Sequence, residues 1–342
     1  MKLAIAGVGN NISALLQGVT YYGMLDAEVL PGVARPSLGG ISVTDVEAVA
    51  VFDLAPNKVG KKLSDAMFAE PNNYPRLNIP GLNNDPEVVF GIADPSDQSQ
   101  IDAVAQVLRD SGAEVFLYSL PTGLPEVAAA YGRAAVDAGV AVVNCTPDPI
   151  AGLPELFAEA RDKNIPMVGD DLQSHIGSSI VHGTVLSLLE ERGITLTGSY
   201  QLNIGGNADF KNLREHGGNK EASKHRALRQ KISNTDAVTV IPSAGFVGHL
   251  DDRKIAHMSV EGRGWADMPV RMEISLQVQD SSNAAGVIID LIRIAAVAAR
   301  GGEGGFPVAA TQLLKSPQKL TDWQEQVPDG RAALSALATD HA

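Results

Sequence analysis

The first half of the chain alternates short apolar runs with stretches that have helical spacing. Apolar runs bounded by turn residues are typical of buried strands, and residues 14–22 and the stretch ending at Ala138 are predicted helices. The predicted strands are 2–6, 46–52, 115–120, 141–144 and 166–168. Strands that alternate with helices predict a parallel sheet whose carboxyl edge binds ligands.

After about Ser199 the pattern changes to alternating apolar and polar residues. Such segments are found at 200–204, 237–241, 255–260 and 272–278. This alternation predicts a sheet with one buried face, and helical spacing returns at 286–299. Proline, glycine and asparagine punctuate 26–45 and 70–88, which predicts loops there. The predicted fold class is α/β, with a Rossmann-type doubly wound parallel sheet and a second, α+β open-sheet lobe.

Length and charge narrow the classes of partner. A chain of 342 residues is long for one simple domain and suits two lobes. The net charge of -13 argues against nucleic acid or an anionic membrane as partner, because both require a basic surface. A phosphate on a small-molecule substrate would therefore be held by a local cluster of cations and backbone N–H groups.

Cysteine usage and hydropathy predict a cytoplasmic protein. The single cysteine, Cys145, excludes an intramolecular disulfide and fits a reducing compartment. The first apolar run, 3–8, is too short for a secretory signal. The most apolar later stretch, 284–299, is interrupted by Asp290 and Arg293, which predicts a buried helix instead of a membrane span.

A glycine loop directly follows the first predicted strand and reads Gly7-Val8-Gly9-Asn10-Asn11-Ile12-Ser13. Gly7 and Gly9 would let the backbone approach a pyrophosphate, with the N–H groups of the next helix pointing at it. Two glycines in a strand-turn-helix are also compatible with a simple turn.

Asp53 closes the second predicted strand and supports the interpretation of the loop as a dinucleotide-binding site. A carboxylate at this position can accept hydrogen bonds from the adenosine ribose hydroxyls, and it would repel a 2′-phosphate. We therefore expect NAD instead of NADP. A solvated turn residue is the alternative for Asp53.

Several later blocks carry a resemblance to a known family. They are Asn203 to Phe210, Val260-Glu261-Gly262-Arg263, Asp280 to Gly286, and Leu314-Lys315-Ser316-Pro317. On these blocks the chain resembles the myo-inositol-1-phosphate synthases. The resemblance extends from Met1 to about Lys319. That family isomerises a sugar phosphate into a cyclitol phosphate with NAD. The resemblance implies oxidation at C5 of a hexose 6-phosphate, enolisation at C6, an intramolecular aldol step and re-reduction.

The resemblance also implies a domain organisation and a set of site residues. The domains expected are 1–198 for the dinucleotide, 199–283 for catalysis and tetramerisation, and 284–342 returning to the dinucleotide domain. A homotetramer follows from the family. The candidate catalytic residues are Lys315, Lys254, Arg263, Lys231, Asp209, Asp280 and Asn283. The candidate cofactor-binding residues are Gly7, Gly9, Asn10, Asn11, Ser13, Asp53, Pro121, Asp170 and Asp171.

Two of these candidates have structural alternatives. Arg263 could form a bridge with Glu261 or Asp267, and Asp280 followed by Ser-Ser-Asn also resembles a helix N-cap. Asp170 and Asp171 could hold a cation, but no metal is predicted. His175 and His182 would lie on one face of a predicted helix, where packing or surface roles are favoured over metal binding.

The sequence departs from the family at three positions. The family stretch Lys-x-Ile-Ser-Lys corresponds here to Gln230-Lys231-Ile232-Ser233-Asn234, so that both essential lysines are amides. Gln173 also stands where the family usually has a lysine.

Three interpretations of these departures remain open. In the first, other cations such as Lys211, Lys224 or Lys231 compensate within ordinary inositol phosphate synthesis. In the second, the same chemistry acts on fructose 6-phosphate and closes a five-membered ring, because the acceptor carbonyl moves from C1 to C2. In the third, the chain is an inactive NAD-binding relative. A plain dehydrogenase, which would accumulate NADH, is the alternative chemistry.

Overall fold

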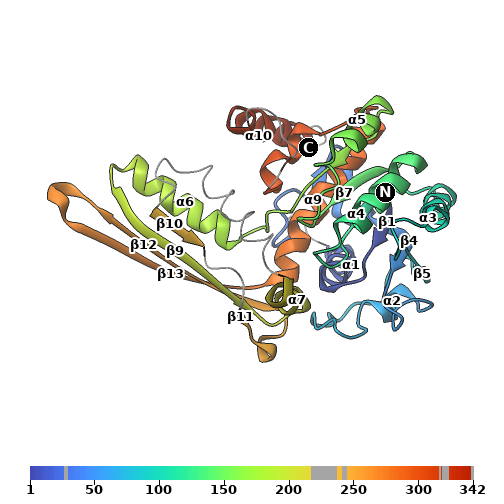
Figure 1. The fold of residues 1–342 in the computed structure, drawn as a ribbon, viewed down its shortest axis with the longest axis horizontal. Coiled ribbons are helices and arrows are strands. Elements are labelled where there is room, and N and C mark those ends of the chain that lie inside the picture. The colour runs from blue at the N-terminus through green and yellow to red at the C-terminus, as the bar shows by residue number, and fades with distance from the viewer. Residues whose placement is uncertain (27–29, 217–236, 241–244, 316, 318–322, 340–342) are drawn as a thin grey trace. The chain divides into compact units, whose positions relative to one another are not determined.

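The computed structural model describes the chain except for residues 27–29, 217–236, 241–244, 316, 318–322 and 340–342. The chain forms two compact units (Figure 1). Unit 1 comprises Met1–Leu172 and Ala284–Ala342, and unit 2 comprises Gln173–Asn283.

Unit 1 is built on a six-stranded parallel sheet (Figure 1). The strands, in spatial order, are β5 (Val88–Phe90), β4 (Glu47–Asp53), β1 (Lys2–Ala6), β6 (Val115–Tyr118), β7 (Ala141–Asn144) and β8 (Met167–Val168). If these six strands are numbered 1 to 6 as they occur along the chain, their spatial order is 3-2-1-4-5-6, that of the dinucleotide-binding fold. In that fold, ligands bind at the carboxyl ends of the strands, near the point where the strand order reverses. The predicted α/β class and Rossmann-type sheet are confirmed.

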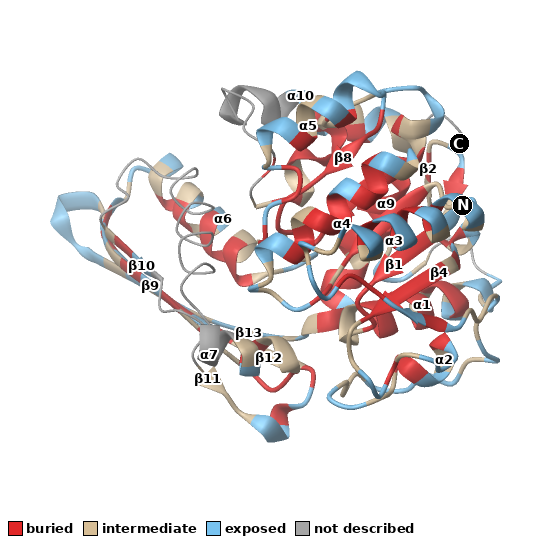
Figure 2. Cartoon of the chain, turned by 45° about the vertical axis from the view of Figure 1, so that its right-hand side comes forward, coloured by how far each residue is buried: buried red, intermediate tan, exposed pale blue. Residues whose placement is uncertain are grey.

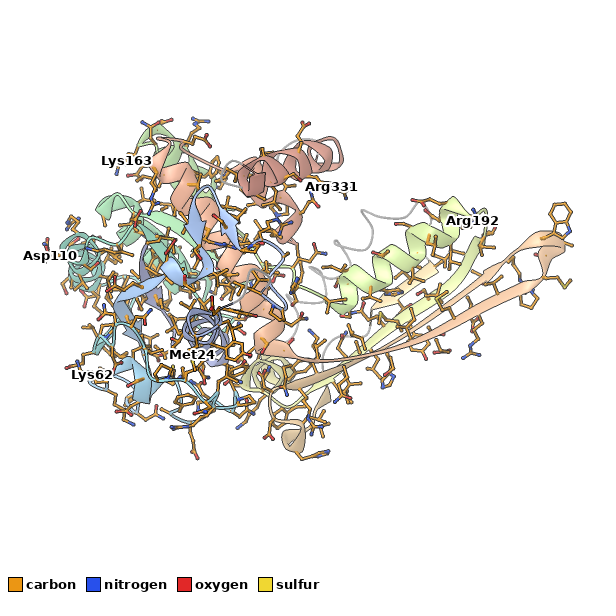
Figure 3. All side chains as sticks on the ribbon, turned by 180° about the vertical axis from the view of Figure 1, so that it is seen from behind. Met24, Lys62, Asp110, Lys163, Arg192 and Arg331 are labelled. Carbon is orange, nitrogen blue, oxygen red and sulfur yellow. The ribbon has the colours of Figure 1, made fainter. Side chains whose placement is uncertain are left out.

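Apolar side chains on both faces of this sheet are covered by helices (Figure 2). The helices are α1 (Asn10–Gly23), α2 (Leu63–Ala66), α3 (Gln98–Ser111), α4 (Pro125–Ala138), α5 (Pro154–Asp162), α9 (Asp280–Arg300) and α10 (Trp323–Thr339). One core cluster joins Leu3 and Ile5 of β1 to α1 and α9, and the other joins Ala4 and Ala6 to α3 and α4. Alternate residues of β1 thus enter opposite layers, as the period of a strand requires. Charged side chains such as Lys62, Asp110 and Lys163 lie on the outside (Figure 3).

Helix α9 is long and apolar enough to cross a membrane by length and composition alone. Most of its apolar window, 72%, is buried inside the protein, and Ile288, Leu291 and Ile292 belong to the core of unit 1. These contacts are those of a core helix.

Unit 2 is a five-stranded sheet with one long helix (Figure 1). The long strands β9 (Thr195–Gly205), β12 (Arg253–Arg263) and β13 (Pro269–Gln279) pair antiparallel, and the short strands β10 (Val238–Val240) and β11 (Gly245–Phe246) pair parallel with β9. Helix α6 (Ser178–Glu191) buries Leu186 and Leu189 against Leu196 and Val260 of the sheet, and α7 (Ala208–His216) follows β9.

The second compact unit begins earlier than the catalytic domain expected from the sequence, which starts at residue 199. The physical reason is that α6 packs on β9 and β12 of the open sheet. Of the two histidines expected on one helix face, only His182 lies in α6; His175 precedes the helix and is exposed, so that expectation was wrong. The segment expected as a loop over 26–45 contains the hairpin β2 (Ser37–Leu38) and β3 (Ile41–Ser42) and a 3-10 turn, Val43–Asp45.

Candidate active site

The glycine loop lies at the carboxyl end of β1 and leads into α1. Gly7 has a φ of +94°, and a Cβ there would lie 2.5 Å from the carbonyl oxygen of Ser119, so the turn itself requires glycine. Gly9 is different: its φ is -95°, and a Cβ would meet nothing within 4 Å. Packing within the protein therefore does not explain why residue 9 is glycine, whereas close approach of the loop backbone to a ligand does. The loop and the first turn of α1, which has no side-chain cap at Gly9, fit a dinucleotide pyrophosphate.

Asp53, at the end of β4, is buried with 5% exposure and is not a solvated turn residue. Its Oδ2 accepts a hydrogen bond from Val8 N (2.7 Å), and its Oδ1 accepts from Leu54 N (2.8 Å) and Ala55 N (2.9 Å). These bonds tie the carboxylate to the glycine loop as well as to its own turn.

Asn10 and Ser13, also expected to bind cofactor, make contacts within the protein. Asn10 Oδ1 accepts from Asn73 N (2.9 Å), and Asn10 Nδ2 donates to Asn73 Oδ1 (2.6 Å). Ser13 is fully buried and its Oγ accepts from Gln17 Nε2 (3.1 Å). Asn11 is half-buried in the first turn of α1, and Pro121 is exposed just after β6.

Asp170 and Asp171 follow β8 and serve different partners. Asp170 accepts hydrogen bonds from Asn144 Nδ2 and from the backbone N–H groups of residues 150–152, at 2.7–3.2 Å. Burial raises the pKa of Asp170, and these hydrogen bonds oppose the rise. Because its carboxyl group already accepts four hydrogen bonds that hold the 144–152 segment, Asp170 has a structural role in this arrangement.

Asp171 pairs with Lys315. The two side chains form an ion pair of 2.9 Å, are 5% and 12% exposed, and are joined again by the backbone bond from Lys315 N to Asp171 O (2.7 Å). Asp171 has a φ of +60°, a conformation that aspartate tolerates and that this second bond helps to hold. The pair therefore presents a fixed ammonium at the carboxyl edge of the parallel sheet.

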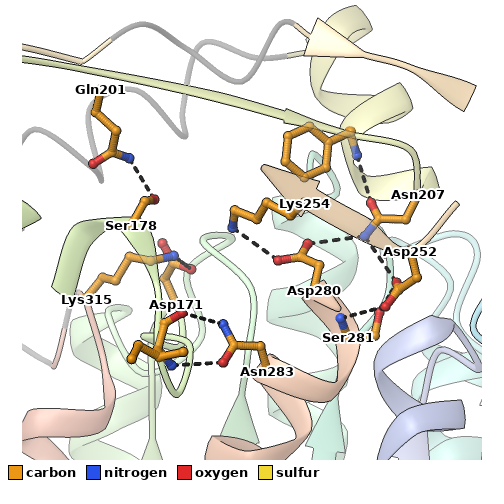
Figure 4. A network of polar contacts seen from close by, with 12 residues as sticks. Asp171, Ser178, Gln201, Asn207, Asp252, Lys254, Asp280, Ser281, Asn283 and Lys315 are labelled. Atoms are coloured by element: carbon orange, nitrogen blue, oxygen red, sulfur yellow. Dashed lines mark hydrogen bonds and ion pairs between the residues drawn. The ribbon is translucent and has the colours of Figure 1, made fainter. Parts of the chain in front are cut away.

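Unit 2 gathers a second polar cluster where β12 begins and α9 starts (Figure 4). Lys254 Nζ lies 3.1 Å from Asp280 Oδ1, with both side chains 16% exposed. Asn207 Nδ2 donates to Asp280 Oδ2 (3.2 Å) and to Asp252 Oδ1 (3.4 Å). Asp252, 1% exposed, accepts from Ser281 N (3.0 Å) and Ser281 Oγ (2.6 Å).

Asp252 was missed by the sequence analysis, although it lies two residues before Lys254. Asp252 caps the start of α9, because its carboxylate accepts a hydrogen bond from Ser281 N. Asp280, the first residue of α9, pairs with Lys254.

The remaining catalytic candidates lie in different surroundings. Asn283 holds the chain before α6 through Ile176, with one bond from Ile176 N (2.8 Å) and one to Ile176 O (2.8 Å). Asp209 lies in the first turn of α7, next in the chain to Phe210, whose ring Lys254 Nζ approaches at 5.9 Å. Lys231, Gln230 and Asn234 lie outside the described residues.

Arg263, a catalytic candidate like Lys254, does not lie in the cluster around Lys254. Lys254 and Arg263 stand near opposite ends of the 11-residue strand β12. At about 3.3 Å per residue they are roughly 30 Å apart. Arg263 donates instead to the backbone carbonyl of Asp267 (3.3 Å) at the β12–β13 turn, and among the described residues it forms no ion pair with Glu261 or Asp267.

Two buried polar groups of unit 2 were not among the candidates. Asn203 on β9 is fully buried, and its amide N and O have no hydrogen-bond partner in the described part of the chain. It pairs in register with Ala256, and the next pair along the same face is Gly205 with Lys254. An orphaned buried amide beside a lysine points to a polar ligand. Its signal in the sequence is an asparagine at an inward position of an alternating strand.

The second group is centred on His182 of α6, which is fully buried. Its Nε2 contacts Ser199 Oγ, which itself donates to the carbonyl of Ser259 (2.9 Å), and its Nδ1 lies 3.3 Å from Gln201 Oε1. Burial lowers the pKa of His182 and favours the neutral ring.

The cysteine, the metal-ligating side chains and the other lysine positions give less support for a catalytic site. Burial raises the pKa of the Cys145 thiol, which makes it a poor nucleophile. No group of three or more metal-ligating His, Cys, Asp or Glu side chains occurs among the residues that the structure describes. Lys211 is exposed on α7, Lys224 lies outside the described residues, and Gln173 brings a half-buried amide, and no cation, to its position.

Comparison with known proteins identifies the family. A family model described as myo-inositol-1-phosphate synthase matches residues 177–281. Inositol-3-phosphate synthase of Mycolicibacterium smegmatis is 39% identical over 340 residues, which cover 93% of each chain. The chain belongs to the inositol-phosphate synthase family.

Two solved structures of similar proteins show how far the likeness extends. The crystal structure of Ari2 is 50% identical, covers 99% of both chains and superposes with a TM-score of 0.88. Inositol-3-phosphate synthase from Caenorhabditis elegans, at 17% identity, covers 98% of this chain and 85% of its own with a TM-score of 0.71, and shows the fold alone. The resemblance inferred from the motifs is confirmed, and the chain is an isomerase-type cyclase of the inositol-phosphate synthase family.

Proposed function

We propose that this protein catalyses the NAD-dependent cyclisation of a hexose 6-phosphate to a cyclitol phosphate. The observation that carries the proposal is the nearly buried Lys254–Asp280 pair, held by Asn207, in a chain of this family. A cyclase needs fixed cations beside developing oxyanions, and an ammonium with a single anchoring carboxylate provides one.

The glycine loop supports NAD as the cofactor. The open approach at Gly9 and the uncapped start of α1 would hold the pyrophosphate, and Asp53 fixes the loop. When bound, NAD supplies the hydride acceptor for oxidation at C5 and returns the hydride at the end, so that the overall reaction is an isomerisation.

Lys254 and Lys315 are the proposed catalytic cations. Each ammonium is oriented by one aspartate, at 3.1 Å from Asp280 and at 2.9 Å from Asp171. A lysine in such a pair can stabilise an alkoxide or enolate oxygen and can exchange a proton with it, because both functions need a positioned N–H donor. Asn203, whose amide has no partner among the described residues, is a further proposed contact for a sugar hydroxyl or carbonyl.

The identity of the hexose is tested by two parallel incubations with NAD⁺, one with glucose 6-phosphate and one with fructose 6-phosphate. Both substrates must be free of isomerase, and the product is followed by phosphorus NMR and mass spectrometry. An inositol phosphate from glucose 6-phosphate alone is the expected result of ordinary family chemistry. Failure of both substrates to give a cyclitol phosphate would contradict activity on these two hexose 6-phosphates and leave another sugar phosphate or an inactive relative.

Fructose 6-phosphate is a second candidate because of specific substitutions. Gln173, Gln230 and Asn234 replace lysines of the family, and Gln173 is a half-buried amide. Loss of cations is compatible with a moved acceptor carbonyl, since oxidation at C5 and the phosphate position stay the same when C2 replaces C1 as acceptor. A five-membered cyclitol phosphate from fructose 6-phosphate alone would establish this variant.

We also propose a homotetramer, as the family resemblance implies, and a cytoplasmic location, as cysteine usage predicts. Light scattering after size-exclusion chromatography would give four times the 35.8 kDa of one chain. A mass of one or two chains at micromolar concentration would contradict it.

A further inference from the structure

Val8, between the two loop glycines, has both backbone polar groups held from inside unit 1. Its N–H donates to Asp53 Oδ2 (2.7 Å), and its carbonyl accepts from Lys58 Nζ and Asn72 Nδ2, each at 2.8 Å. Lys58 is only 6% exposed, and its ammonium lies 3.8 Å from Asp53 Oδ2. A lysine is almost never this buried without a partner that holds it there, and here the partners are the Val8 carbonyl, the Asp53 carboxylate and Asn72 Oδ1 (3.4 Å).

The direction of the Val8 carbonyl sets the direction of the next N–H. The Val8–Gly9 peptide is trans and planar, so its carbonyl and its N–H point in opposite directions. Because the carbonyl points toward Lys58 and Asn72, the N–H of Gly9 points away from them. Within the described residues this N–H has no hydrogen-bond partner, and the Cβ position of Gly9 is open for 4 Å.

Asn72 is itself held on α1 by the segment to which it belongs. We call Asn72–Leu77 the strap. Asn10 accepts from Asn73 N (2.9 Å), and Gln17 accepts from Leu77 N (2.7 Å) and donates to Pro75 O (3.2 Å). The strap thus follows α1 and fixes the amide of Asn72 over the Val8 carbonyl.

We propose that Lys58 and Asn72 are positioning residues that aim the Gly9 N–H at the pyrophosphate of the dinucleotide. Neither residue touches the cofactor in this account; both act through the Val8–Gly9 peptide. The inference rests on the proposed NAD function and adds to it the residues that preorganise the phosphate donor. Preorganised donors bind a phosphate more tightly because they lose less freedom on binding.

The test measures dissociation constants of three ligands by calorimetry for the wild-type chain and for Lys58→Met and Asn72→Leu. The ligands are NAD⁺, ADP and adenosine, of which only adenosine lacks the pyrophosphate. Each variant is expected to weaken NAD⁺ and ADP by about tenfold, the size of one lost charge-assisted hydrogen bond, and to leave adenosine within about twofold. Asn57→Leu is the matched control, because Asn57 Nδ2 donates to Glu70 O on the exposed side of the same region.

Two outcomes would overturn the inference alone, and a third would overturn the proposed function as well. Equal weakening of all three ligands would mean a general structural role, and unchanged NAD⁺ affinity in both variants would mean that the loop does not depend on these residues. If Lys58→Met does not fold, Asn72→Leu decides by the same criterion. A wild-type chain that binds adenosine and NAD⁺ equally weakly would overturn the proposed NAD function and this inference with it.

Discussion

Lys254 and Asp280 form the ion pair on which the proposed chemistry depends most. The pair is 16% exposed on both sides, and Asn207 holds the second oxygen of the carboxylate. Bonds of this kind fix the ammonium before substrate arrives, which is how an enzyme stabilises charge that develops only in the transition state. Asp252 supports the pair indirectly, because it accepts hydrogen bonds from both Asn207 and Ser281.

We predict that Lys254→Met lowers kcat by about 100-fold or more, the effect of removing one donor to a developing oxyanion. The dissociation constant for NAD⁺ should stay within about twofold, because Lys254 lies outside the proposed dinucleotide loop. Steady-state kinetics and calorimetry measure the two quantities. Arg271→Met is the control, since Arg271 forms an exposed pair with Glu273 in the same unit. Near wild-type kcat in Lys254→Met would remove this lysine from the mechanism.

At the scale of elements, α9 is anchored to the β2–β3 hairpin by a buried arginine. Arg293 is 0% exposed, pairs with Asp290 (2.6 Å) and donates to the carbonyls of Arg35, Pro36 and Ile41. Asp290 also pairs with Arg35 at 2.7 Å. The two charged residues that interrupt the apolar stretch 284–299, Asp290 and Arg293, therefore belong to a structural ion cluster.

Removing this arginine should destabilise unit 1 strongly. We predict that Arg293→Met lowers the free energy of unfolding by about 3–5 kcal/mol, because Asp290 loses its fully buried partner and three carbonyls lose their donor. Arg300→Met, on the same helix, removes an exposed pair with Glu114 and should cost less than about 1 kcal/mol. Denaturant unfolding compares them, and equal costs would mean that the buried cluster adds nothing.

Helix α6 is joined to β9 by a histidine that burial keeps neutral. The pKa of His182 is lowered from 6.5 in the folded chain, so the unfolded chain takes up the proton first as the pH falls. This contribution to stability is therefore present above about pH 6.5 and is lost as the pH falls toward the folded-state pKa.

The corresponding prediction compares His182→Asn with the wild type from pH 7.5 to 5. The wild-type melting temperature should fall more steeply with acid than that of the variant, because only the wild type carries the buried imidazole. His257→Asn, which changes an exposed histidine of β12, is the control and should keep the wild-type slope. Parallel slopes for wild type and His182→Asn would show that His182 does not titrate with unfolding.

Over the whole molecule, local patterns in the sequence predicted the fold well. Apolar runs identified β1, β4, β6, β7 and β8, and alternation identified β9, β12 and β13. Both patterns involve only residues that are neighbours in the chain, because the burial of a strand determines which of its successive residues are apolar. Strand β5 was missed, since it has three residues at the end of a segment rich in turn residues. The association of α6 with the open sheet depends on contacts between Leu186 and Val260, far apart in the chain, which periodicity does not report.

The site was only partly predictable for a related reason. Motif matches proposed Lys254, Asp280 and Lys315, but no motif gives the side chains around them, so Asp252 and Asn203 were not proposed. The motif did not show that Arg263 and Lys254 lie at opposite ends of β12, because a motif fixes spacing along the strand and not position in the sheet. Asp170 and Asn10 matched expected positions, yet folding uses their side chains for hydrogen bonds within unit 1.

The central claim is an isomerisation in which NAD is regenerated in each turnover. The most direct test supplies the accepted hexose 6-phosphate with deuterium at C5, together with less NAD⁺ than substrate. Mass spectrometry and NMR locate the label, and absorbance at 340 nm follows NADH. The predicted result is a cyclitol phosphate that retains deuterium at C5, in molar excess over NAD⁺, with no accumulation of NADH. Deuterium accumulating in the reduced cofactor, with an oxidised sugar as product, would identify a dehydrogenase and contradict the account.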